Sequence, residues 1–579
     1  MKKKWIYKSV PDQEKVDALS QSINVNSIIG NILLQRGVED FDNAKSFFRP
    51  NIADLHDPFL MKDMDKAVDR INEAIFNEEK ILVYGDYDVD GTTSVTMFFH
   101  FLKSIYQNVG YYIPDRYKEG YGVSKLGVEW AEENSFKLII SLDCGVKANE
   151  MIRLAKTKGI DFIVCDHHKT PDVLPEAIAV LDPKRPDCNY PFKELSGCGV
   201  GFKLMQAFVI NNGVDESVLD QYLDLLAVSI ASDIVPIVGE NRILCHFGLK
   251  TLNQSPRPGI KALIDLSGNK SELTISNIVF GIGPRINAAG RIAHATDAVK
   301  LLLSESIEEA NQIGEGVNYR NETRREIDAS ITDEAIQMIE SSNNMVASTT
   351  VLYKEDWHKG VIGIVASRCI EKYYKPTVIL TMSEGKATGS ARSVRGFDVH
   401  EAISSCEDLL DQYGGHMYAA GLSMPINNVP AFQQRFEEVV STSITEDLLI
   451  PKIEIDLPIQ LDQITPSLVN ILKQMEPFGP ENMEPIFSID NAFIKNRLTV
   501  LKEKHIKAVV GQKNNKAEFD MIGFNFAEYY ESLAQGELFS LAFIIQENNF
   551  RGKKTLQLNV KDIKFVNKTN PEGAIKEIQ

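Results

Sequence analysis

Long apolar runs and paired cysteines are both missing from this chain of 579 residues. No uninterrupted apolar stretch reaches the ~18 residues that a membrane-spanning helix needs. The basic start at residues 1–4 is not followed by the long apolar region of a signal peptide. The seven cysteines are scattered and never occur as Cys-x-x-Cys, which argues against a zinc site or a disulfide framework. These absences predict a cytoplasmic protein with no membrane contact.

An excess of basic residues is also missing, because the formal net charge is −18. A nucleic-acid-binding protein is expected to show a basic footprint, but salt screening makes the local field decisive over about 8–10 Å. Residues 491–516 carry seven Lys or Arg against a single acid, Glu503. We interpret this stretch as a contact for DNA. The alternative is that these charges belong only to solvated strands and loops.

Three aspartates alternate at Asp86, Asp88 and Asp90, directly after the apolar run of residues 81–83. The run is typical of a buried strand, and open α/β sheets bind ligands at the carboxyl ends of their strands. Alternate residues of an extended chain share one face, so three like charges would repel one another unless a cation lay between them. Hard oxygen ligands suit Mg²⁺ or Mn²⁺. The spacing predicts a divalent metal site; a polar turn closed by Gly91 is the alternative.

Further apolar segments also end in acidic or imidazole residues. They deliver Asp143, the Asp-His-His of residues 166–168, Asp182 and Asp233. Helical patterns between the strands predict a parallel, doubly wound sheet, in which all these strand ends lie along one edge. Four or five carboxylates and two histidines at one edge are the ligand set for two divalent ions, a standard arrangement for phosphoryl transfer.

The order Asp-x-Asp-x-Asp-Gly, Asp-Cys-Gly, Asp-His-His and Ser-Asp resembles the DHH phosphoesterase superfamily. Within it, the chain resembles the RecJ family of single-strand-specific 5′ exonucleases over almost its whole length. Residues 114–122 and 283–291 match RecJ-type segments, and residues 389–393 and 414–421 resemble the DHH-associated substrate-binding domain. The resemblance implies a single-stranded-DNA-specific 5′→3′ exonuclease that releases 5′ mononucleotides in DNA recombination and repair.

The resemblance also implies the roles of individual residues. It implies ligands for two Mn²⁺ or Mg²⁺ ions at Asp88, Asp90, Asp143, His167 and Asp233, with Asp143 bridging the ions. It makes Asp86 a supporting carboxylate close to the metals, with a ligand role as the alternative. It makes His168 the group that contacts the scissile phosphate or stabilises its developing charge. It implies substrate contacts at Arg116, Arg285, Asn287, Arg291, Arg368, Ser390, Arg392 and His416. For the arginines, surface or interdomain ion pairing is the alternative, and His416 could instead hold its glycine turn together.

One position departs from the small-substrate relatives. Family II pyrophosphatases and short-oligonucleotide phosphodiesterases carry a metal-binding His four residues before the Asp-x-Asp pair, where this chain has Tyr84. The difference favours DNA hydrolysis over pyrophosphatase activity. A small-substrate phosphodiesterase for short oligonucleotides or cyclic dinucleotides, a non-catalytic DNA-binding scaffold, and RNA as the substrate remain alternatives.

The chain divides into expected parts of the α/β class. Residues 305–340 are rich in Glu, Arg and Asn with little Gly, which is typical of a long exposed helix, and short alternating runs in 449–566 indicate small β architecture. With the resemblance, we expect a lead-in at 1–49, a DHH metal-binding domain at 50–304, a connecting helix at 305–346, a second α/β domain at 347–445, an OB-fold barrel at 446–566 and a tail at 567–579. The family implies single-stranded DNA as partner, with single-strand-binding protein and a helicase acting alongside; a monomer is expected.

Overall fold

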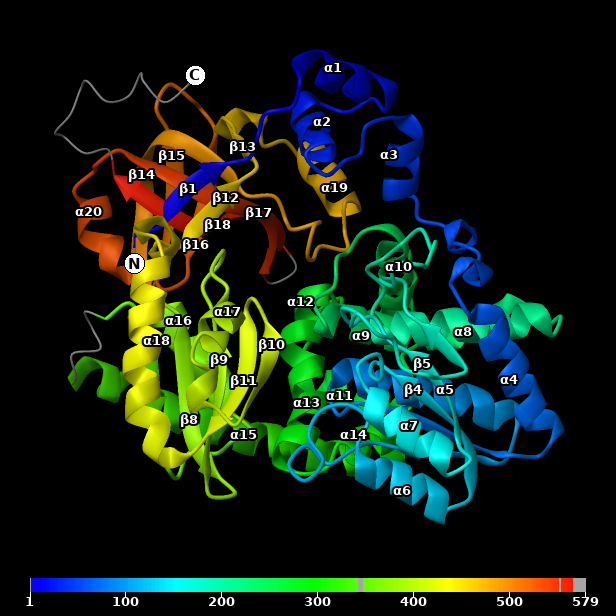
Figure 1. The fold of residues 1–579 in the computed structure, drawn as a ribbon. Helices are drawn as coiled ribbons and strands as arrows, with labels where there is room; N and C mark the ends of the chain where they lie inside the picture. The colour runs from blue at the N-terminus through cyan, green and yellow to red at the C-terminus, as the bar shows by residue number, and fades with distance from the viewer. Residues whose placement is uncertain (1, 342–346, 551–552, 566–579) are drawn as a thin grey trace. The chain divides into compact units, whose positions relative to one another are not determined.

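The computed structural model describes residues 2–341, 347–550 and 553–565, which form two compact units (Figure 1). Unit 1 combines the described residues of the first fifty with those from Pro451 onward, and unit 2 holds Asn51–Ile450 with Gly479–Glu481. The expected tail at 567–579 and the last residues of the expected connecting helix, 342–346, lie outside the described residues. No helix in the described part of the chain has the length and apolar character to cross a membrane.

The metal-binding part of unit 2 is built on a five-stranded parallel sheet in the order β3-β2-β4-β5-β6. The strands are β2 (Lys80–Gly85), β3 (Val109–Tyr112), β4 (Phe136–Leu142), β5 (Asp161–Cys165) and β6 (Ala179–Leu181). Helices α5 (Val89–Ile105), α6 (Lys125–Glu133) and α7 (Asn149–Thr157) connect the first four of them. The predicted parallel, doubly wound sheet is confirmed.

Alternate residues of these strands point into two separate cores. Ile81 and Val83 pack with α5 and with α4 (Met64–Phe76), α8 (Gly197–Asn211) and α9 (Leu223–Ser232), whereas Leu82 and Tyr84 pack with α6 and α7. A strand buried on both faces reads as a continuous apolar run. This explains why residues 81–83 show no polar alternation.

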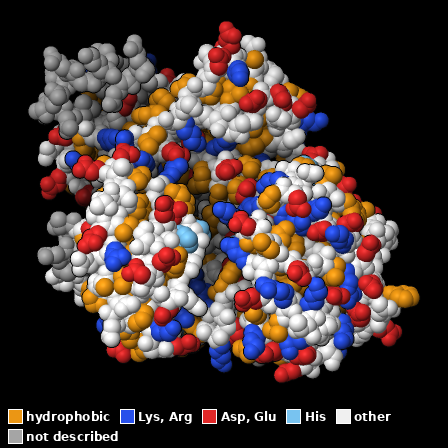
Figure 2. Space-filling model, in the orientation of Figure 1, with side chains coloured by type: hydrophobic (Ala, Val, Ile, Leu, Met, Phe, Trp, Pro, Cys, Tyr) orange, Lys and Arg blue, Asp and Glu red, His pale blue; other side chains and the backbone are white. Residues whose placement is uncertain are grey.

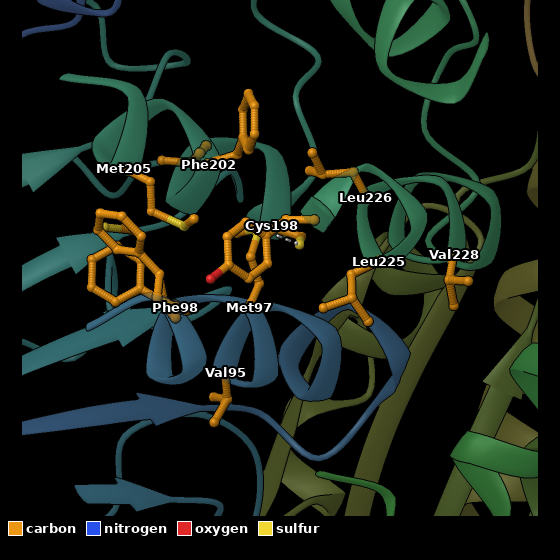
Figure 3. Close-up of a cluster of buried hydrophobic side chains, with 14 of the residues drawn as sticks. Val95, Met97, Phe98, Cys198, Phe202, Met205, Leu225, Leu226 and Val228 are labelled. Carbon is orange, nitrogen blue, oxygen red and sulfur yellow. Dashed lines mark hydrogen bonds between the residues drawn. The ribbon is translucent and has the colours of Figure 1, made fainter. Parts of the chain in front are cut away.

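The first core fixes the helices that reach the carboxyl edge of the sheet. Met97 and Phe98 of α5 face residues of α8 and α9, whereas Val95 points to the other side of the helix, toward β2 (Figure 3). Met97 and Cys198 bring their sulfur atoms within 3.8 Å of each other. The start of α8 is therefore held beside α5, and the N-terminus of α5 carries the candidate ligands Asp88 and Asp90.

A long helix connects this sheet to a second one within unit 2. After α10 (Gly239–Gln254), α11 (Pro258–Ser267), α12 (Ile275–Asn277), a π-helical turn (Ile278–Ile282), α13 (Gly283–Ile292) and α14 (Thr296–Leu303), the chain forms α15 (Ile307–Ser341). The beginning of α15 contributes Ala310 and Val317 to the first core, and its end contributes Ile331 and Ala335 to a core shared with α16 (Ile362–Tyr373). The long helix is thus packed at both ends, not freely exposed.

The second sheet has the order β10-β11-β9-β8-β7 and is mixed. Only β7 (Thr350–Tyr353) and β8 (Thr377–Ser383) are parallel; β9 (Lys386–Arg392), β10 (Gln412–His416) and β11 (Ala419–Met424) pair antiparallel. The sheet shares a core with α17 (Val399–Ser404) and α18 (Val429–Ser443). This is the expected second α/β module.

Unit 1 contains a closed barrel. Its strands are β13 (Leu457–Pro458), β14 (Phe487–Leu501), β15 (His505–Gln512), β16 (Glu518–Gly523), β17 (Phe539–Phe550) and β18 (Lys553–Phe565), and pairing of β14 with β17 closes it. Between β16 and β17 lies α20 (Tyr530–Ala534). The small β architecture predicted for this region is confirmed.

The first fifty residues share the core of this barrel. β1 (Lys4–Tyr7) pairs in parallel with β12 (Lys452–Ile455), and Trp5 Nε1 donates to Asp562 Oδ2 at 2.7 Å. Leu19 and Ile29 pack in one cluster with Leu468 and Phe543. Four helices supply this layer: α1 (Gln13–Ser22), α2 (Ser27–Leu34), α3 (Phe41–Phe48) and α19 (Pro466–Gln474). Segments from the two ends of the chain therefore form one folded unit.

Candidate active site

The turn between β2 and α5 carries the three alternating aspartates. Asp88 caps α5, with its Oδ1 accepting from Gly91 N at 3.0 Å, and Asp90 lies in the first helical turn. The expectation that the three carboxylates continue an extended strand is wrong, because the helix begins at Val89. Gly91 permits this tight turn, since a Cβ there would lie 2.4 Å from the carbonyl oxygen of Asp86.

Asp90 is fixed by the start of α8 and by the last turn of α9. Its carboxylate accepts hydrogen bonds from Gly197 N at 2.7 Å, Cys198 N at 2.9 Å and Ser229 Oγ at 2.6 Å. The N-terminus of α8 stabilises the negative charge of this buried side chain. A Cβ at Gly197 would lie 2.5 Å from Cβ of Asp143, so the same glycine brings α8 against a second carboxylate.

His167 lies among three of the carboxylates. Its Nε2 is 3.2 Å from Asp143 Oδ1, 3.5 Å from Asp233 Oδ2 and 3.8 Å from Asp90 Oδ2. Two overlapping groups each offer ligand atoms within 4.8 Å of one another: Asp143 with His167 and His168, and Asp90 with His167 and Asp233. The predicted meeting of these strand and helix ends at one edge is confirmed.

Like charges crowd this edge. Burial, followed by the charge of Asp90, raises the pKa of Asp88 and holds the pKa of Asp143 and of Asp233 well above the ordinary value. Burial and the charge of Asp88 do the same to the pKa of Asp86. Asp143 also has a left-handed backbone, with φ of 61°, which non-glycine residues adopt rarely and often at functional sites. A nearby cation stabilises such a set of carboxylates in its charged form.

The donor set fits a divalent cation. Both ring nitrogens of His167 are buried, and neither has a hydrogen-bond partner among the described residues. An imidazole nitrogen together with several carboxylate oxygens is a ligand set that Mn²⁺ and Mg²⁺ accept. The residues gathered at the sheet edge therefore match the ions that the sequence predicts.

His168 is oriented by two partners. Its Nδ1 lies 2.7 Å from Asp166 Oδ1, and its Nε2 lies 3.0 Å from the Tyr121 hydroxyl. Burial alone lowers the pKa of His168, but the hydrogen bond and charge of Asp166 outweigh it and raise the pKa to about 9. A cationic imidazole held beside the carboxylate cluster can neutralise charge on phosphate oxygens.

A cavity of about 1290 Å³ lies beside this centre, between loops of the parallel sheet and the second sheet of unit 2 (Figure 2). Its lining includes Ser390 and five cationic residues, Arg116, Arg291, Lys359, Lys386 and Arg392. Four acidic residues also line it, and Lys386 pairs with one of them, Asp411, at 3.0 Å. Burial, followed by the charge of Arg116, lowers the pKa of Arg291 to about 10. The three arginines are partly buried and lie close to one another, an arrangement that suits an anion such as phosphate.

The cationic residues of the cavity are held in defined orientations. The Arg116 guanidinium lies 4.8 Å from the centre of the Tyr87 ring. Arg291 donates through Nη1 to Gly360 O at 3.1 Å, and Arg392 donates to Ser390 Oγ at 3.0 Å. Of the residues implied for substrate contact, Arg116, Arg291, Ser390 and Arg392 are brought together.

Four other implied substrate residues do not line this cavity. Arg285 donates to Asn318 Oδ1 at 2.9 Å, Gly281 O at 2.6 Å and Leu266 O at 2.9 Å. Arg368 donates to the buried Asp328 at 2.8 Å. Asn287 is half-buried on α13, and His416 is exposed at the end of β10. The alternative of ion pairing between parts of the chain fits Arg368.

Two cavity lysines were not singled out by sequence reasoning. Lys359 lies in the glycine-rich turn of residues 358–363, and this turn is the sequence feature that could have indicated a binding residue there. Lys386 starts β9, six residues before Arg392, and nothing in its local sequence marks it. Both depend on where the second sheet places them.

Comparisons with known proteins agree with this geometry. The family described as DHH family, N-terminal domain, matches residues 80–230, the DHHA1 domain matches 343–442, and the RecJ OB domain matches 455–562. The single-stranded-DNA-specific exonuclease RecJ of Bacillus subtilis is 37% identical over 95% of this chain and 70% of its own length. The protein of the same name from Escherichia coli is 33% identical over 87% of this chain and 90% of its own length.

Solved structures give the same result. The crystal structure of RecJ in complex with Mn²⁺ from Thermus thermophilus covers 97% of this chain and 79% of that one, with a TM-score of 0.83 and 26% identity. A structure of exonuclease RecJ bound to manganese covers 69% of this chain and 98% of that one, with a TM-score of 0.59 and 31% identity. With the metal-ligand cluster, the cationic cavity and the barrel on the same chain, these similarities show that the chain belongs to the RecJ family of DHH phosphoesterases.

Proposed function

We propose that this chain is a single-stranded-DNA-specific 5′→3′ exonuclease that releases 5′ mononucleotides by metal-dependent hydrolysis. The observation that carries the proposal is the pairing of a carboxylate–histidine cluster with an adjoining cationic cavity in unit 2. A phosphodiester at the cluster and a terminal phosphate in the cavity would belong to neighbouring positions of one strand. The names of the related exonucleases support the same substrate.

In this proposal Asp88, Asp90, Asp143, His167 and Asp233 would hold the metal ions. Mn²⁺ or Mg²⁺, when bound, would lower the pKa of a water molecule and neutralise charge on the phosphate. The backbone amides of Gly197 and Cys198 keep Asp90 in place. Asp86, the residue after β2, supports the cluster as a buried carboxylate.

His168 is proposed to stabilise the phosphate as charge develops on its oxygens. Asp166 fixes the ring by accepting at Nδ1, so Nε2 faces Tyr121 and the cluster. A ring held by two partners needs little reorganisation when the phosphate binds. The leaving group is the 3′ oxygen of the first nucleotide, which gives a 5′ mononucleotide as the product.

The 5′ end is proposed to bind in the cationic cavity. Arg116, Arg291 and Arg392 offer guanidinium groups, which fork onto phosphate oxygens with fixed geometry, and Ser390 adds a hydroxyl. Capture of the terminal phosphate beside the metal ligands would select the first phosphodiester bond. This supplies a physical reason for 5′ polarity.

Unit 1 is proposed to bind the strand through its barrel, since OB-folds bind single strands in a basic groove with aromatic platforms. Phe543 is fully buried in the barrel core, whereas Phe524 is 51% exposed and available for stacking. We further propose a monomer that works in the cytoplasm in DNA recombination and repair, alongside single-strand-binding protein and a helicase.

Two alternative functions are less well supported. A small-substrate phosphodiesterase is not favoured, because the chain carries a RecJ-type barrel and has a buried Tyr84 where small-substrate relatives carry histidine. A non-catalytic scaffold is not favoured either, because the full set of carboxylates and His167 is retained.

The test is degradation of a single strand labelled at its 3′ end, in Mn²⁺, with a duplex and a dinucleotide as comparison substrates. The proposal predicts mononucleotide release from the 5′ end of the single strand and little action on the duplex. Cleavage of the dinucleotide alone would support the small-substrate function. DNA binding without any cleavage would support the scaffold.

A further inference from the structure

An irregular segment of the chain, residues 114–122, borders both parts of the site. Arg116 and Tyr117 line the cationic cavity, and the Tyr121 hydroxyl contacts His168. Tyr121 also lines a second cavity of about 490 Å³, together with Gly145 and His168. The segment contains no helix or strand, and Gly120 and Gly122 both have φ of 82°. A segment without its own secondary structure needs side-chain contacts to hold one shape.

Tyr84 of β2 supplies one of the side-chain contacts that hold the segment. It is the penultimate residue of β2 and is fully buried. Its hydroxyl donates to Gly122 O at 3.0 Å and accepts from Ser124 N at 3.1 Å. Its ring stacks on Tyr112 of β3, with ring centres 5.4 Å apart. One phenol therefore satisfies both a carbonyl and an amide at the end of the segment.

Glu119 supplies the second contact from within the segment. Its carboxylate accepts from Asp115 N at 2.7 Å and from the Tyr112 hydroxyl at 3.0 Å. It also accepts from the Ser124 hydroxyl. Ser124 in turn caps α6 by accepting from Gly127 N at 2.9 Å. Both ends of the segment are thus tied to β3 and to the start of α6.

We propose that Tyr84 and Glu119 are positioning residues that hold the 114–122 segment in the shape that binds the 5′ end of the strand. The segment places Arg116 in the cationic cavity and Tyr121 beside His168, five residues apart. Its shape therefore sets where the strand end lies relative to the carboxylate cluster. This inference rests on the proposed exonuclease function. It also gives Tyr84 a structural role at the position where small-substrate relatives carry a metal-binding histidine.

Removing only the hydroxyl separates positioning from folding. Tyr84→Phe keeps the aromatic ring, which stacks on Tyr112. It also keeps the close contact of this ring with Gly127, where a Cβ would lie 2.6 Å from the ring. The same change leaves Gly122 O and Ser124 N without their phenol partner. Glu119→Gln is the second variant, because an amide can replace only part of the carboxylate's three acceptor bonds.

Tyr106→Phe is the matched control. Its hydroxyl donates to Glu79 O at 2.7 Å, near the opposite end of β2 from the aspartates. The change removes a tyrosine hydroxyl bonded to a backbone carbonyl without touching the 114–122 segment. It is therefore expected to leave single-strand hydrolysis unchanged.

The experiment measures kcat and KM for a 5′-phosphorylated single strand in Mn²⁺, with hydrogen–deuterium exchange of the peptide covering residues 114–124. Misplacement of binding groups by about 1 Å can cost up to ~100-fold in efficiency. We expect Tyr84→Phe and Glu119→Gln to raise KM by roughly tenfold or more and to speed exchange in this peptide. The loss of kcat should be smaller than the rise in KM, because Asp166 still holds His168.

An unchanged KM in both variants would overturn the inference, whether or not exchange becomes faster. So would equal losses of kcat and kcat/KM with a lower melting temperature, because that pattern reports a smaller folded fraction. Wild-type protein that hydrolyses no single strand would instead reject the proposed function, and exchange in the 114–124 peptide would still report the anchoring.

Discussion

Arg392 and Arg285, to which the family resemblance gives the same substrate-binding role, are expected to behave differently on replacement. Arg392 lines the cationic cavity, where burial, followed by the charge of Arg116, lowers its pKa. The guanidinium of Arg285 instead donates hydrogen bonds to Asn318 Oδ1, Gly281 O and Leu266 O. Arg392→Ala should weaken binding of the strand end, and Arg285→Ala should weaken the fold.

The magnitudes follow from the contacts. A hydrogen bond to a charged group contributes about 1.5–3 kcal/mol, so loss of one phosphate contact at Arg392 should raise KM for a 5′-phosphorylated strand by roughly 10–150-fold. Arg285 makes three hydrogen bonds within unit 2. At a net ~1 kcal/mol each, their loss should lower the free energy of unfolding by about 3 kcal/mol.

The assay pairs steady-state kinetics in Mn²⁺ with thermal unfolding of the same preparations. Each variant serves as the control for the other, since both remove one guanidinium from unit 2. The reasoning would be refuted if Arg285→Ala raised KM as much as Arg392→Ala while its melting temperature stayed at the wild-type value. It would also be refuted if Arg392→Ala bound the strand as tightly as wild type.

Two further predictions concern stability. Mn²⁺ should raise the melting temperature of the wild-type protein, with ~2.7 kcal/mol of stabilisation at a Mn²⁺ concentration 100 times the dissociation constant. The melting temperature of His167→Ala should rise much less. An equal rise in both proteins would contradict the assignment of His167 as a ligand. Asp182 is fully buried, and burial, followed by the charge of Asp166, raises its pKa to about 7 despite a hydrogen bond from Lys184 N. Because the folded state then binds the proton more tightly than the unfolded state, wild type loses stability as pH rises from about 4 through 7. In EDTA at pH 8, Asp182→Asn should therefore be more stable than wild type by up to about 4 kcal/mol and should melt at a higher temperature. The difference in melting temperature between the two proteins should shrink toward pH 4. A difference that stays constant from pH 4 to pH 8 would contradict the raised pKa.

The parallel sheet and its acidic edge could be predicted because both follow from local sequence. Apolar runs ending in Asp or His are read directly, and parallel strands carry their ends to one edge. The geometry inside the turn could not be read in this way. The extended alternation of Asp86, Asp88 and Asp90 fails because Asp88 caps a helix that begins at Val89. A strand pattern of three residues is too short to show where the helix takes over.

The substrate side of the site was harder to predict from sequence. Arg285 and Arg291 lie six residues apart on α13, yet only Arg291 reaches the cavity, because helical geometry turns them to different neighbours. Lys386 lines the cavity from β9 and Lys359 from the turn between β7 and α16. Such contacts depend on long-range packing, which a residue's own neighbours in sequence do not encode.

The two ends of the chain illustrate the same limit. The pairing of β1 with β12 joins residues more than four hundred positions apart. The local sequence of Lys4–Tyr7 does not predict which strand it pairs with. The bonds of Tyr84 to Gly122 and Ser124 are likewise made in space, about forty residues along the chain.

The most direct test of the central claim is the rate of 5′-mononucleotide release from a 3′-labelled single strand as Mn²⁺ is titrated, for wild type and Asp143→Asn. Asn keeps the size of the side chain but removes a charge from the cluster around His167. The account predicts saturable, Mn²⁺-dependent release by wild type and a loss on the order of a thousandfold in the variant, which corresponds to several kcal/mol of metal-assisted stabilisation. Release by Asp143→Asn at the wild-type rate, or wild-type release that is unaffected by a chelator, would contradict it.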